Sequence, residues 1–261
     1  MKKIFLFLIM FCFLFPQTVF AHTLTTQYDW YFKPKGINTR PVVFDNKEFP
    51  EKYGTISIGS PDEKIIYLTF DAGYASDNLV KILDILKEQN VTAAFFILPA
   101  VIEKKPEVAE RLAKDGHIVA NHSFSHKNMV QITDKETFLK EITDLEEMYY
   151  SYTGYQMSKY FRPPAGRFSE QNLMYCYEEG YTPTFWSFAY ADWDNNAQKK
   201  IEWAKKKILD NVHNGMVMLL HPNSETNTLI LNDVINECRA QGYRFGTLDE
   251  LKAYYDSKKA D

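Results

Sequence analysis

Short apolar segments alternate with amphipathic segments along most of this chain. The apolar segments cover residues 64–70, 92–98, 117–122, 159–164, 182–189 and 215–221. The amphipathic segments cover residues 76–90, 105–116, 134–154, 169–180, 201–211 and 231–242. Regular alternation of this kind predicts parallel strands covered by helices, in either an open sheet or a closed barrel.

The amphipathic segments carry local helix signals. In residues 76–90, leucine and isoleucine recur at the spacing of one helix face. Pro106 stands near the start of the second segment, while Gly116 and Gly154 stand at the ends of the second and third. At 261 residues the chain is long enough for a single α/β domain of barrel size.

Residues 22–62 differ from the rest of the chain. They lack helical periodicity and are rich in proline, glycine, asparagine and aromatic residues. We expect an irregular N-terminal arm here, packed on a main domain at residues 63–254 that is followed by a C-terminal tail at 255–261. Trp30 and its two aromatic neighbours are the expected anchors of the arm, and a sugar-contacting Trp30 is the alternative.

Residues 1–21 have the organisation of a secretory signal peptide. Two lysines precede an apolar run, and Val19 and Ala21 form a small-residue cleavage pattern. Pro16 ends the apolar run early, whereas a spanning helix needs roughly 20 residues. We therefore expect cleavage after Ala21 and secretion to the cell-wall side of the membrane, with an uncleaved anchor as the alternative.

The charge balance bears on the kind of partner. The whole chain has a formal net charge of −4, and loss of the two lysines of the leader makes it more acidic. Proteins that bind nucleic acid carry basic faces. We therefore expect no nucleic-acid partner.

Three cysteines are present. Cys12 lies in the expected leader, while Cys176 and Cys238 lie in segments predicted to be helical. We expect the latter two to be small buried hydrophobes, with a disulfide between them as the alternative. No CxxC pair occurs, which excludes a thiolate zinc site of that spacing.

Side chains capable of chemistry follow five of the apolar segments. They are Asp71, the pair His122 and His126, Arg162, the pair Asp192 and Trp193, and His221. In parallel α/β folds the C-terminal ends of the strands meet on one face, and active sites lie there. One such residue indicates little, but five converging strand ends predict an active site.

Each of these residues also has a plainer interpretation. His122 and His126 are four apart, which on a helical turn places both rings on one face as in a metal pair, but chance produces the same spacing. His221 could equally be a satisfied core histidine, and Arg162 an ordinary ion-pair partner of a nearby carboxylate. The remaining histidines, which we expect to be structural or at the surface, are His22, His117 and His213.

Five motifs, in this order, resemble those of the polysaccharide deacetylase family, carbohydrate esterase family 4. They are TFDAG (69–73), HSFSH (122–126), RPPAG (162–166), DW (192–193) and LLH (219–221). The resemblance covers about residues 63–254 and implies a distorted (β/α) barrel of about seven strands. The segments DWYFKP, FWSFAYADW and LLHPNSETN look closest to the subgroup that deacetylates N-acetylmuramic acid in peptidoglycan, in the synthesis of muramic δ-lactam in spore cortex.

The resemblance implies metal-assisted hydrolysis of an acetamide. A divalent ion, zinc or similar, would be held by His122 and His126 and would lower the pKa of a bound water. Asp71 would act as the general base, held in position by Arg162.

The family's other roles fall on the later motifs. His221 would protonate the departing amine, with Asp192 raising the pKa of its ring. The backbone N–H of Ala165 would stabilise the oxyanion. The residues expected to contact the substrate are Trp193, Leu219 and Tyr74.

Ala72 departs from the family pattern. Many members that act on chitin or xylan have a second aspartate here as a metal ligand, and alanine has no ligand atom. We expect an ion held weakly through the two histidines, water and Asp71. The alternatives are a substitute ligand such as Asp77 or Asn121, or chemistry without a tightly held ion.

The expected partner is a glycan strand of peptidoglycan, bound by a monomeric enzyme. A deacetylase of chitin-type or xylan-type polymers is one alternative, and a non-catalytic glycan-binding barrel is another. The retained acid, base and supporting residues argue against the non-catalytic protein. Arg167, beside the RPPAG motif, either contacts substrate or lies on the rim.

Overall fold

The computed structural model describes residues 23–46, 48–74 and 76–259, and the expected signal peptide at 1–21 lies outside them. Its centre is a parallel sheet with the strand order β10–β4–β5–β6–β7–β9, in which β11 also pairs with β4. The strands are β4 (Ile65–Ala72), β5 (Ala94–Ile97), β6 (Ile118–Asn121), β7 (Tyr160–Phe161), β9 (Thr182–Pro183), β10 (Met216–Leu220) and β11 (Arg244–Gly246).

The sheet curls, and residues 184–188 join its two edges. This segment continues from β9, and Phe188 then bridges Met218 of β10. The Ser187 N–H donates to the Val217 carbonyl (3.0 Å), and the Leu219 N–H donates to the Phe188 carbonyl (2.9 Å). The expected distorted barrel is confirmed, but the strand expected at 182–189 is regular only over Thr182–Pro183 because the segment changes partners along its length.

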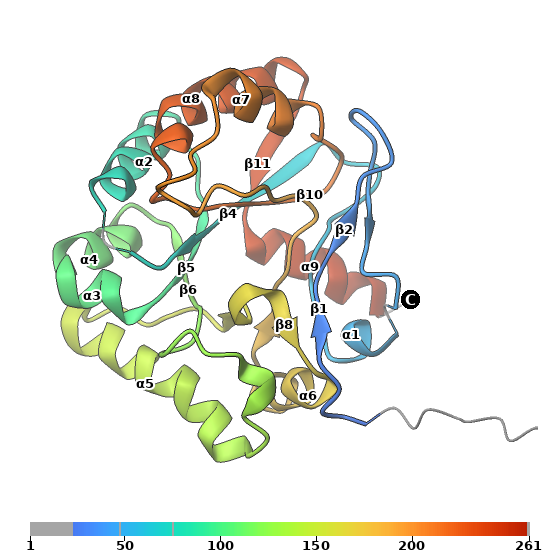
Figure 1. Cartoon of the computed structure of the whole chain (residues 1–261), viewed down its shortest axis with the longest axis vertical. Coiled ribbons are helices and arrows are strands. Elements are labelled where there is room, and N and C mark those ends of the chain that lie inside the picture. Colours follow the sequence, from blue (N-terminus) through green and yellow to red (C-terminus); the bar gives the residue numbers. More distant parts are fainter. Residues whose placement is uncertain (1–22, 47, 75, 260–261) are drawn as a thin grey trace, which may run out of the picture.

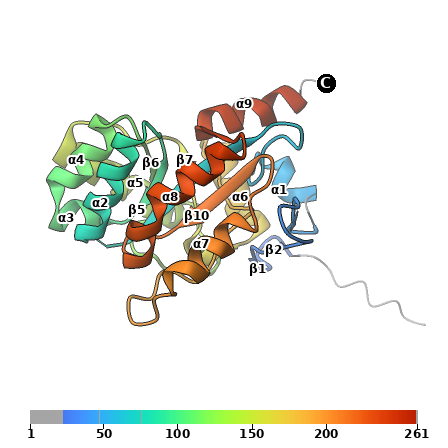
Figure 2. The same ribbon diagram turned by 90° about the horizontal axis from the view of Figure 1, so that it is seen from above.

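Helices cover the outside of the curled sheet (Figures 1 and 2). They are α2 (Asp77–Glu88), α3 (Pro99–Lys104), α4 (Pro106–Lys114), α5 (Lys135–Thr153), α6 (Glu170–Glu178), α7 (Ile201–Leu209), α8 (Glu225–Ala240) and α9 (Leu248–Lys259). The Asp134 side chain caps α5 by accepting from the Thr137 N–H (2.8 Å), and Gly154 ends the helix in the left-handed conformation. Residues 255–259, expected as part of a tail, instead continue α9. No helix within the described ranges is long and apolar enough to cross a membrane.

Strand β4 has two different faces. Its helix-facing residues, which belong to the apolar core beneath the helices, are Ile66, Leu68, Phe70 and Ala72. Ile65 and Tyr67 belong to a second cluster with inward residues of β5, β6 and β10. Because side chains alternate along a strand, Asp71 lies on the same side as Tyr67, at the inner end of the barrel.

The N-terminal arm consists of short elements packed on the barrel. They are β1 (Tyr28–Asp29), β2 (Phe32–Lys33), β3 (Val42–Val43) and α1 (Glu48–Lys52), and β1 pairs with β8 (Arg167–Phe168). Trp30 is 8% exposed and stacks on Phe185 with ring centroids 4.2 Å apart. Its backbone N–H donates to the Gly166 carbonyl and its indole N–H to the Trp186 carbonyl, both at 2.8 Å. Trp30 is therefore an anchor that ties together two loops, and its burial argues against a sugar contact.

The cysteines behave as expected from their helical context. Cys176 on α6 and Cys238 on α8 are both free and buried. Burial raises the pKa of the Cys238 thiol to about 12, so this thiol stays protonated at neutral pH. The prediction of buried hydrophobes is confirmed.

Two glycines allow the chain before β4 to approach the start of β10. The Gly59 N–H donates to the Gly215 carbonyl at 2.7 Å. Gly215 has a φ of +70°, and a Cβ there would lie 2.4 Å from the carbonyl carbon of Gly59. Any side chain at this position would push two backbone segments apart.

We expect Gly215→Ala to lower the free energy of unfolding by about 2–4 kcal/mol, from left-handed strain plus the displaced backbone. Gly116→Ala is the matched control, because Gly116 has a φ of +81° but a Cβ there meets nothing within 4 Å. The control should lose only about 1 kcal/mol. Urea denaturation of both variants measures the difference, and equal losses would show that the approach to Gly59 imposes no constraint.

Candidate active site

A cavity of about 540 Å³ opens at the C-terminal ends of the barrel strands. Its lining residues are Asp71, Gly73, Tyr74, Leu98, His122, His126, Ala165, Trp186, Ala189, Tyr190, Trp193, Leu219, His221 and Asn223. Eight of the ten site residues expected from the sequence are among them. The other two, Arg162 and Asp192, are buried behind Asp71 and His221, respectively.

Arg162 is fully buried and holds Asp71. One terminal nitrogen (Nη1) donates to Asp71 Oδ1 at 2.6 Å, and the other (Nη2) donates to Thr69 Oγ1 at 3.0 Å. Nε donates to the Thr184 carbonyl at 3.1 Å, and the guanidinium lies 3.9 Å from the centroid of the Phe96 ring. Arg162 is thus the ion-pair partner of Asp71, and each of its three guanidinium nitrogens donates a hydrogen bond.

The charge of Asp71 follows from this pairing. Burial, the largest single effect, would raise the pKa of the carboxyl group. The charges of Arg162, His122 and His221 and the hydrogen bond from Arg162 together outweigh burial, so the pKa lies below its ordinary value. Asp71 is therefore an anion at neutral pH. Because it still lines the cavity, it can accept a proton there.

His122 and His126 come together, but not on a helical turn as expected. They lie in a loop in which Ser123 and His126 have positive φ values of 71° and 53°. The Ser123 hydroxyl accepts the His126 N–H at 3.0 Å, and the ring centroids are 5.1 Å apart. A spacing of four residues fits such a turn as well as a helix, so the two rings lie together as expected although the structure around them is not helical.

His122 has the tautomer of a ligand. Its Nδ1 lies 2.8 Å from the Arg162 carbonyl, which only accepts, so Nδ1 carries the proton. Nε2 then presents its lone pair 3.5 Å from Asp71 Oδ2. Burial lowers the pKa of His122 to about 4, so the ring stays neutral at physiological pH and this lone pair stays available.

The donor set fits a divalent ion only in part. The two histidines line the cavity, but no group of three or more His, Cys, Asp or Glu of the described residues is placed to hold a metal. The substitute ligands considered above are committed elsewhere. Asn121 bonds the Ile142 carbonyl and the Ser123 N–H, and Asp77 is exposed on α2 and paired with Lys105.

His221 is held by Asp192, which is 2% exposed. The His221 ring Nδ1 lies 2.7 Å from Asp192 Oδ1, and its backbone N–H donates to Oδ2 at 2.8 Å. Burial lowers the pKa of His221, but the hydrogen bond and charge of Asp192 outweigh it and raise the pKa above its ordinary value. His221 is thus no ordinary core histidine: it lines the cavity, and its raised pKa favours the protonated ring.

The residues expected to form the cavity wall do line the cavity, but their side chains differ in how exposed they are. Leu219 is buried, Trp193 is 56% exposed and packs edge-on to His221, and Tyr74 is also exposed. Ala165 has a φ of 54° in the turn after β7. Arg167 does not line the cavity; it is exposed and lies 3.4 Å from Asp29.

The sequence analysis missed several wall residues. These are Gly73, Leu98, Trp186, Ala189, Tyr190 and Asn223. Trp186 lies in the segment expected to be a strand and Tyr190 directly follows it, so their place near a strand end was a usable signal. Leu98 carries no chemical signal in the sequence.

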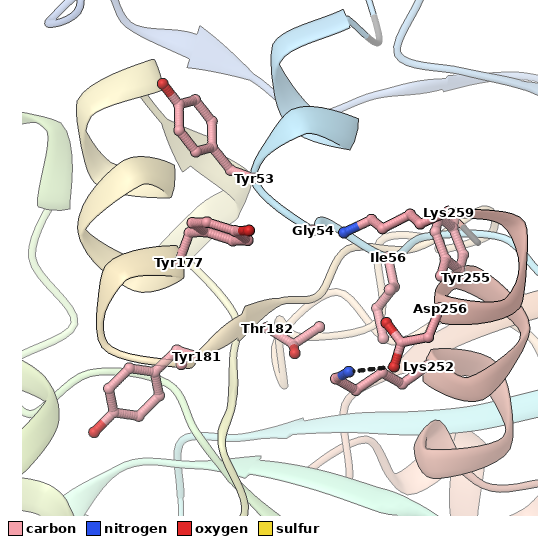
Figure 3. A pocket seen from close by; sticks show the side chains of 11 residues that line it. Tyr53, Gly54, Ile56, Tyr177, Tyr181, Thr182, Lys252, Tyr255, Asp256 and Lys259 are labelled. Carbon is pink, nitrogen blue, oxygen red and sulfur yellow. Dashed lines mark hydrogen bonds and ion pairs between the residues drawn. The ribbon is translucent and has the colours of Figure 1, made fainter.

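A second cavity, of about 270 Å³, lies between α6, α9 and the chain after α1 (Figure 3). Tyrosine side chains and two lysines line it, and Lys252 is paired with Asp256 at 2.5 Å. None of its described lining residues is a histidine. It lacks the acid–base pairing of the larger cavity, which is therefore the candidate active site.

Comparison with known proteins identifies the family to which this chain belongs. A family model described as polysaccharide deacetylase matches residues 58–184. The peptidoglycan-N-acetylmuramic acid deacetylase PdaA of Bacillus subtilis (strain 168) is 36% identical over 225 residues, which cover 85% of each chain. This chain belongs to the polysaccharide deacetylase family.

Other members of the family are also similar. The solved structure of Bacillus subtilis PdaA, a family 4 carbohydrate esterase, superposes with a TM-score of 0.83 at 35% identity, covering 87% of this chain and 97% of that one. A peptidoglycan-N-acetylglucosamine deacetylase of Bacillus cereus is 32% identical over 77% of this chain and 73% of its own. The expected family, fold and hydrolase class are confirmed.

Among the contacts of the deacetylase site, the Asp71–Arg162 ion pair should contribute most to the free energy of unfolding. We expect Arg162→Met to cost about 3–5 kcal/mol at pH 7, because it leaves a buried carboxylate without its cation. Without Arg162, burial should raise the pKa of Asp71, so the variant should bind a proton as the pH falls and the loss should begin to shrink above the ordinary carboxyl pKa of about 3.9. It should shrink further below that value, as wild type loses the contribution of its lowered carboxyl pKa. Urea unfolding at several pH values measures it.

The double variant Asp71→Asn/Arg162→Met is the control. It removes both charges, so it should recover part of the stability lost in Arg162→Met. A double variant that is no more stable than the single one would contradict this account of the ion pair.

Proposed function

We propose that this chain is a secreted peptidoglycan deacetylase that removes the acetyl group from N-acetylmuramic acid residues, in the formation of muramic δ-lactam in spore cortex. One observation carries the proposal: a single cavity holds an anionic carboxylate and a histidine of raised pKa, each backed by a buried partner of opposite charge. The similarity to PdaA, in sequence and in fold, supports the muramic substrate.

Asp71 supplies the general base. Amide hydrolysis needs a water whose proton is removed as it attacks the carbonyl carbon. Asp71 is ionised and fixed by Arg162, and its Oδ2 is not the oxygen that Nη1 binds. Asp71 Oδ2 is therefore the oxygen that takes the proton.

His221 supplies the general acid. The departing amine must gain a proton when the C–N bond breaks. Because Asp192 occupies Nδ1, the ring presents Nε2 to the substrate, and the raised pKa keeps a proton there. The backbone N–H of Ala165 is the proposed donor to the oxyanion.

His122 and His126 are the proposed ligands of a weakly held divalent ion. When bound, such an ion would acidify a water and polarise the acetyl carbonyl. The chain's own contribution is to fix the tautomer of His122 through the Arg162 carbonyl. Monomeric action on exported glycan strands completes the proposal.

Purified glycan strands without peptide stems test the activity. We expect wild type to release acetate from muramic rather than glucosamine residues, and Asp71→Asn to lower kcat about 100-fold or more, because it removes the base. Asp77→Asn is the control: it removes an exposed carboxylate outside the cavity and should keep wild-type activity. Mass spectrometry of the digested strands assigns each lost acetyl group to its sugar.

Two outcomes would count against the proposal. Acetate release mainly from glucosamine residues would overturn the muramic substrate. Equal, negligible release by wild type and Asp71→Asn, with glycan still bound, would favour a non-catalytic binding protein.

Metal binding has a readout that does not depend on activity. We expect excess Zn²⁺ to raise the melting temperature of chelator-treated wild type, and to raise it much less in His126→Ala, which loses one of the two ligands. His126 is exposed, so the variant should fold. An equal shift in both proteins would place the ion elsewhere.

A further inference from the structure

Asn227 lies behind the proposed proton donor and has no role in the chemistry above. It stands in the first turn of α8 and is fully buried. Its side-chain Nδ2 donates to Asp192 Oδ2 at 2.7 Å and to the His221 carbonyl at 3.1 Å. Its Oδ1 accepts a hydrogen bond from the Tyr190 hydroxyl.

The orientation of this amide follows from its partners. A carboxylate and a backbone carbonyl only accept, so both must face the NH₂ group. Oδ1 is then left for Tyr190, whose hydroxyl must donate. The hydrogen bonds therefore run in one direction, from Tyr190 to Asn227 and from Asn227 to Asp192.

The site favours a polar role over a packing role. Apart from Thr226, the buried neighbours of Asn227 along α8 are apolar, among them Ile230, Leu231 and Val234. An amide buried in such surroundings lowers stability unless its hydrogen bonds are made. Here both ends of the amide are used, and two of the three bonds go to the Asp192–His221 pair.

We propose that Asn227 is a positioning residue that aligns Asp192 and the backbone of His221, and that Tyr190 links this alignment to the cavity wall. The proposal rests on the proposed function, in which His221 is the acid. Asp192 Oδ2 accepts from the His221 N–H and from Asn227, while Oδ1 receives the ring. Without Asn227, Oδ2 keeps one of its two donors, and both the carboxylate and the His221 backbone can shift.

Tyr190 extends the arrangement to the substrate. Its ring lines the cavity while its hydroxyl points to Asn227. A sugar that packs on this ring would thus touch a residue two hydrogen bonds away from Asp192. The buried amide of Asn227 thus couples substrate contact at Tyr190 to the orientation of the proposed acid, His221.

The test compares Asn227→Ala with Asn232→Ala. Asn232 lies on the same helix, but its side chain bonds Gln89 rather than the site. For Asn227→Ala we expect kcat to fall at least about tenfold with KM within about twofold of wild type. Burial opposes protonation of the His221 ring, whereas Asp192 favours it. A less firmly held Asp192 should therefore lower the pKa of His221 and move the basic limb of the kcat/KM profile to lower pH. Asn232→Ala should match wild type in all three measurements.

Tyr190→Phe is the second variant, in case Asn227→Ala unfolds. It keeps the ring in the cavity and removes only the donor to Oδ1. We expect a smaller fall in kcat and a shift of the basic limb in the same direction. A Tyr190→Phe profile identical to that of wild type would overturn the link to the cavity wall.

NMR titration of the His221 ring separates this proposal from the proposed function. A ring pKa and a pH profile unchanged in folded Asn227→Ala would overturn the positioning role, whatever the activity. A lowered ring pKa together with no acetate release by wild type would retain the alignment and reject the reaction.

Discussion

The buried ion pair between Arg162 and Asp71 joins the parts of this site. Arg162 donates to Thr69 and Asp71 on β4 and to the Thr184 carbonyl in the segment that closes the barrel. Its own carbonyl accepts from His122 and so sets that ring's tautomer. Burying two charges costs several kcal/mol per ion, and a good geometry with full hydrogen bonding is what offsets the cost. The proposed base, the candidate metal ligand and the barrel closure therefore all contact one residue, Arg162, through its side chain or its backbone carbonyl.

The cavity holds two charged pairs built in opposite ways. In the first pair the cation is buried and the carboxylate lines the cavity, so Arg162 helps to keep Asp71, the proposed base, ionised in spite of its burial. In the second the carboxylate is buried and the histidine faces the substrate, so Asp192 keeps a proton on His221. The two carboxylates of the site thus have different proposed roles, because Asp71 lines the cavity itself whereas Asp192 lies behind His221. In each pair the group that lines the cavity takes its protonation state in part from the charged partner buried behind it.

Local patterns predicted the fold and most of the site, and long-range pairing accounts for what they missed. Strand–helix alternation identified the parallel strands, and the residues after those strands identified Asp71, Arg162 and His221. The loop at 122–126 was predicted as a helical turn because spacing alone does not distinguish it from a turn with positive φ. Asn227 escaped because its role comes from contact with Asp192, 35 positions earlier in the chain. Trp30 was expected as an anchor, but its two hydrogen bonds to the loops at Gly166 and Trp186 follow only from the folded chain.

Ala72 has a packing explanation as well as a chemical consequence. Its side chain belongs to the helix-facing core and does not line the cavity, so alanine at this position costs the fold nothing. The consequence is an incomplete ligand set, and fewer protein ligands mean a lower affinity for a divalent ion. Protons compete little for His122, one of the two proposed ligands, because burial lowers the pKa of its ring to about 4; desolvation also lowers the pKa of the His126 ring. The proposed base and acid take their protonation states from buried partners: Arg162 helps to keep Asp71 ionised, and Asp192 favours the protonated form of His221.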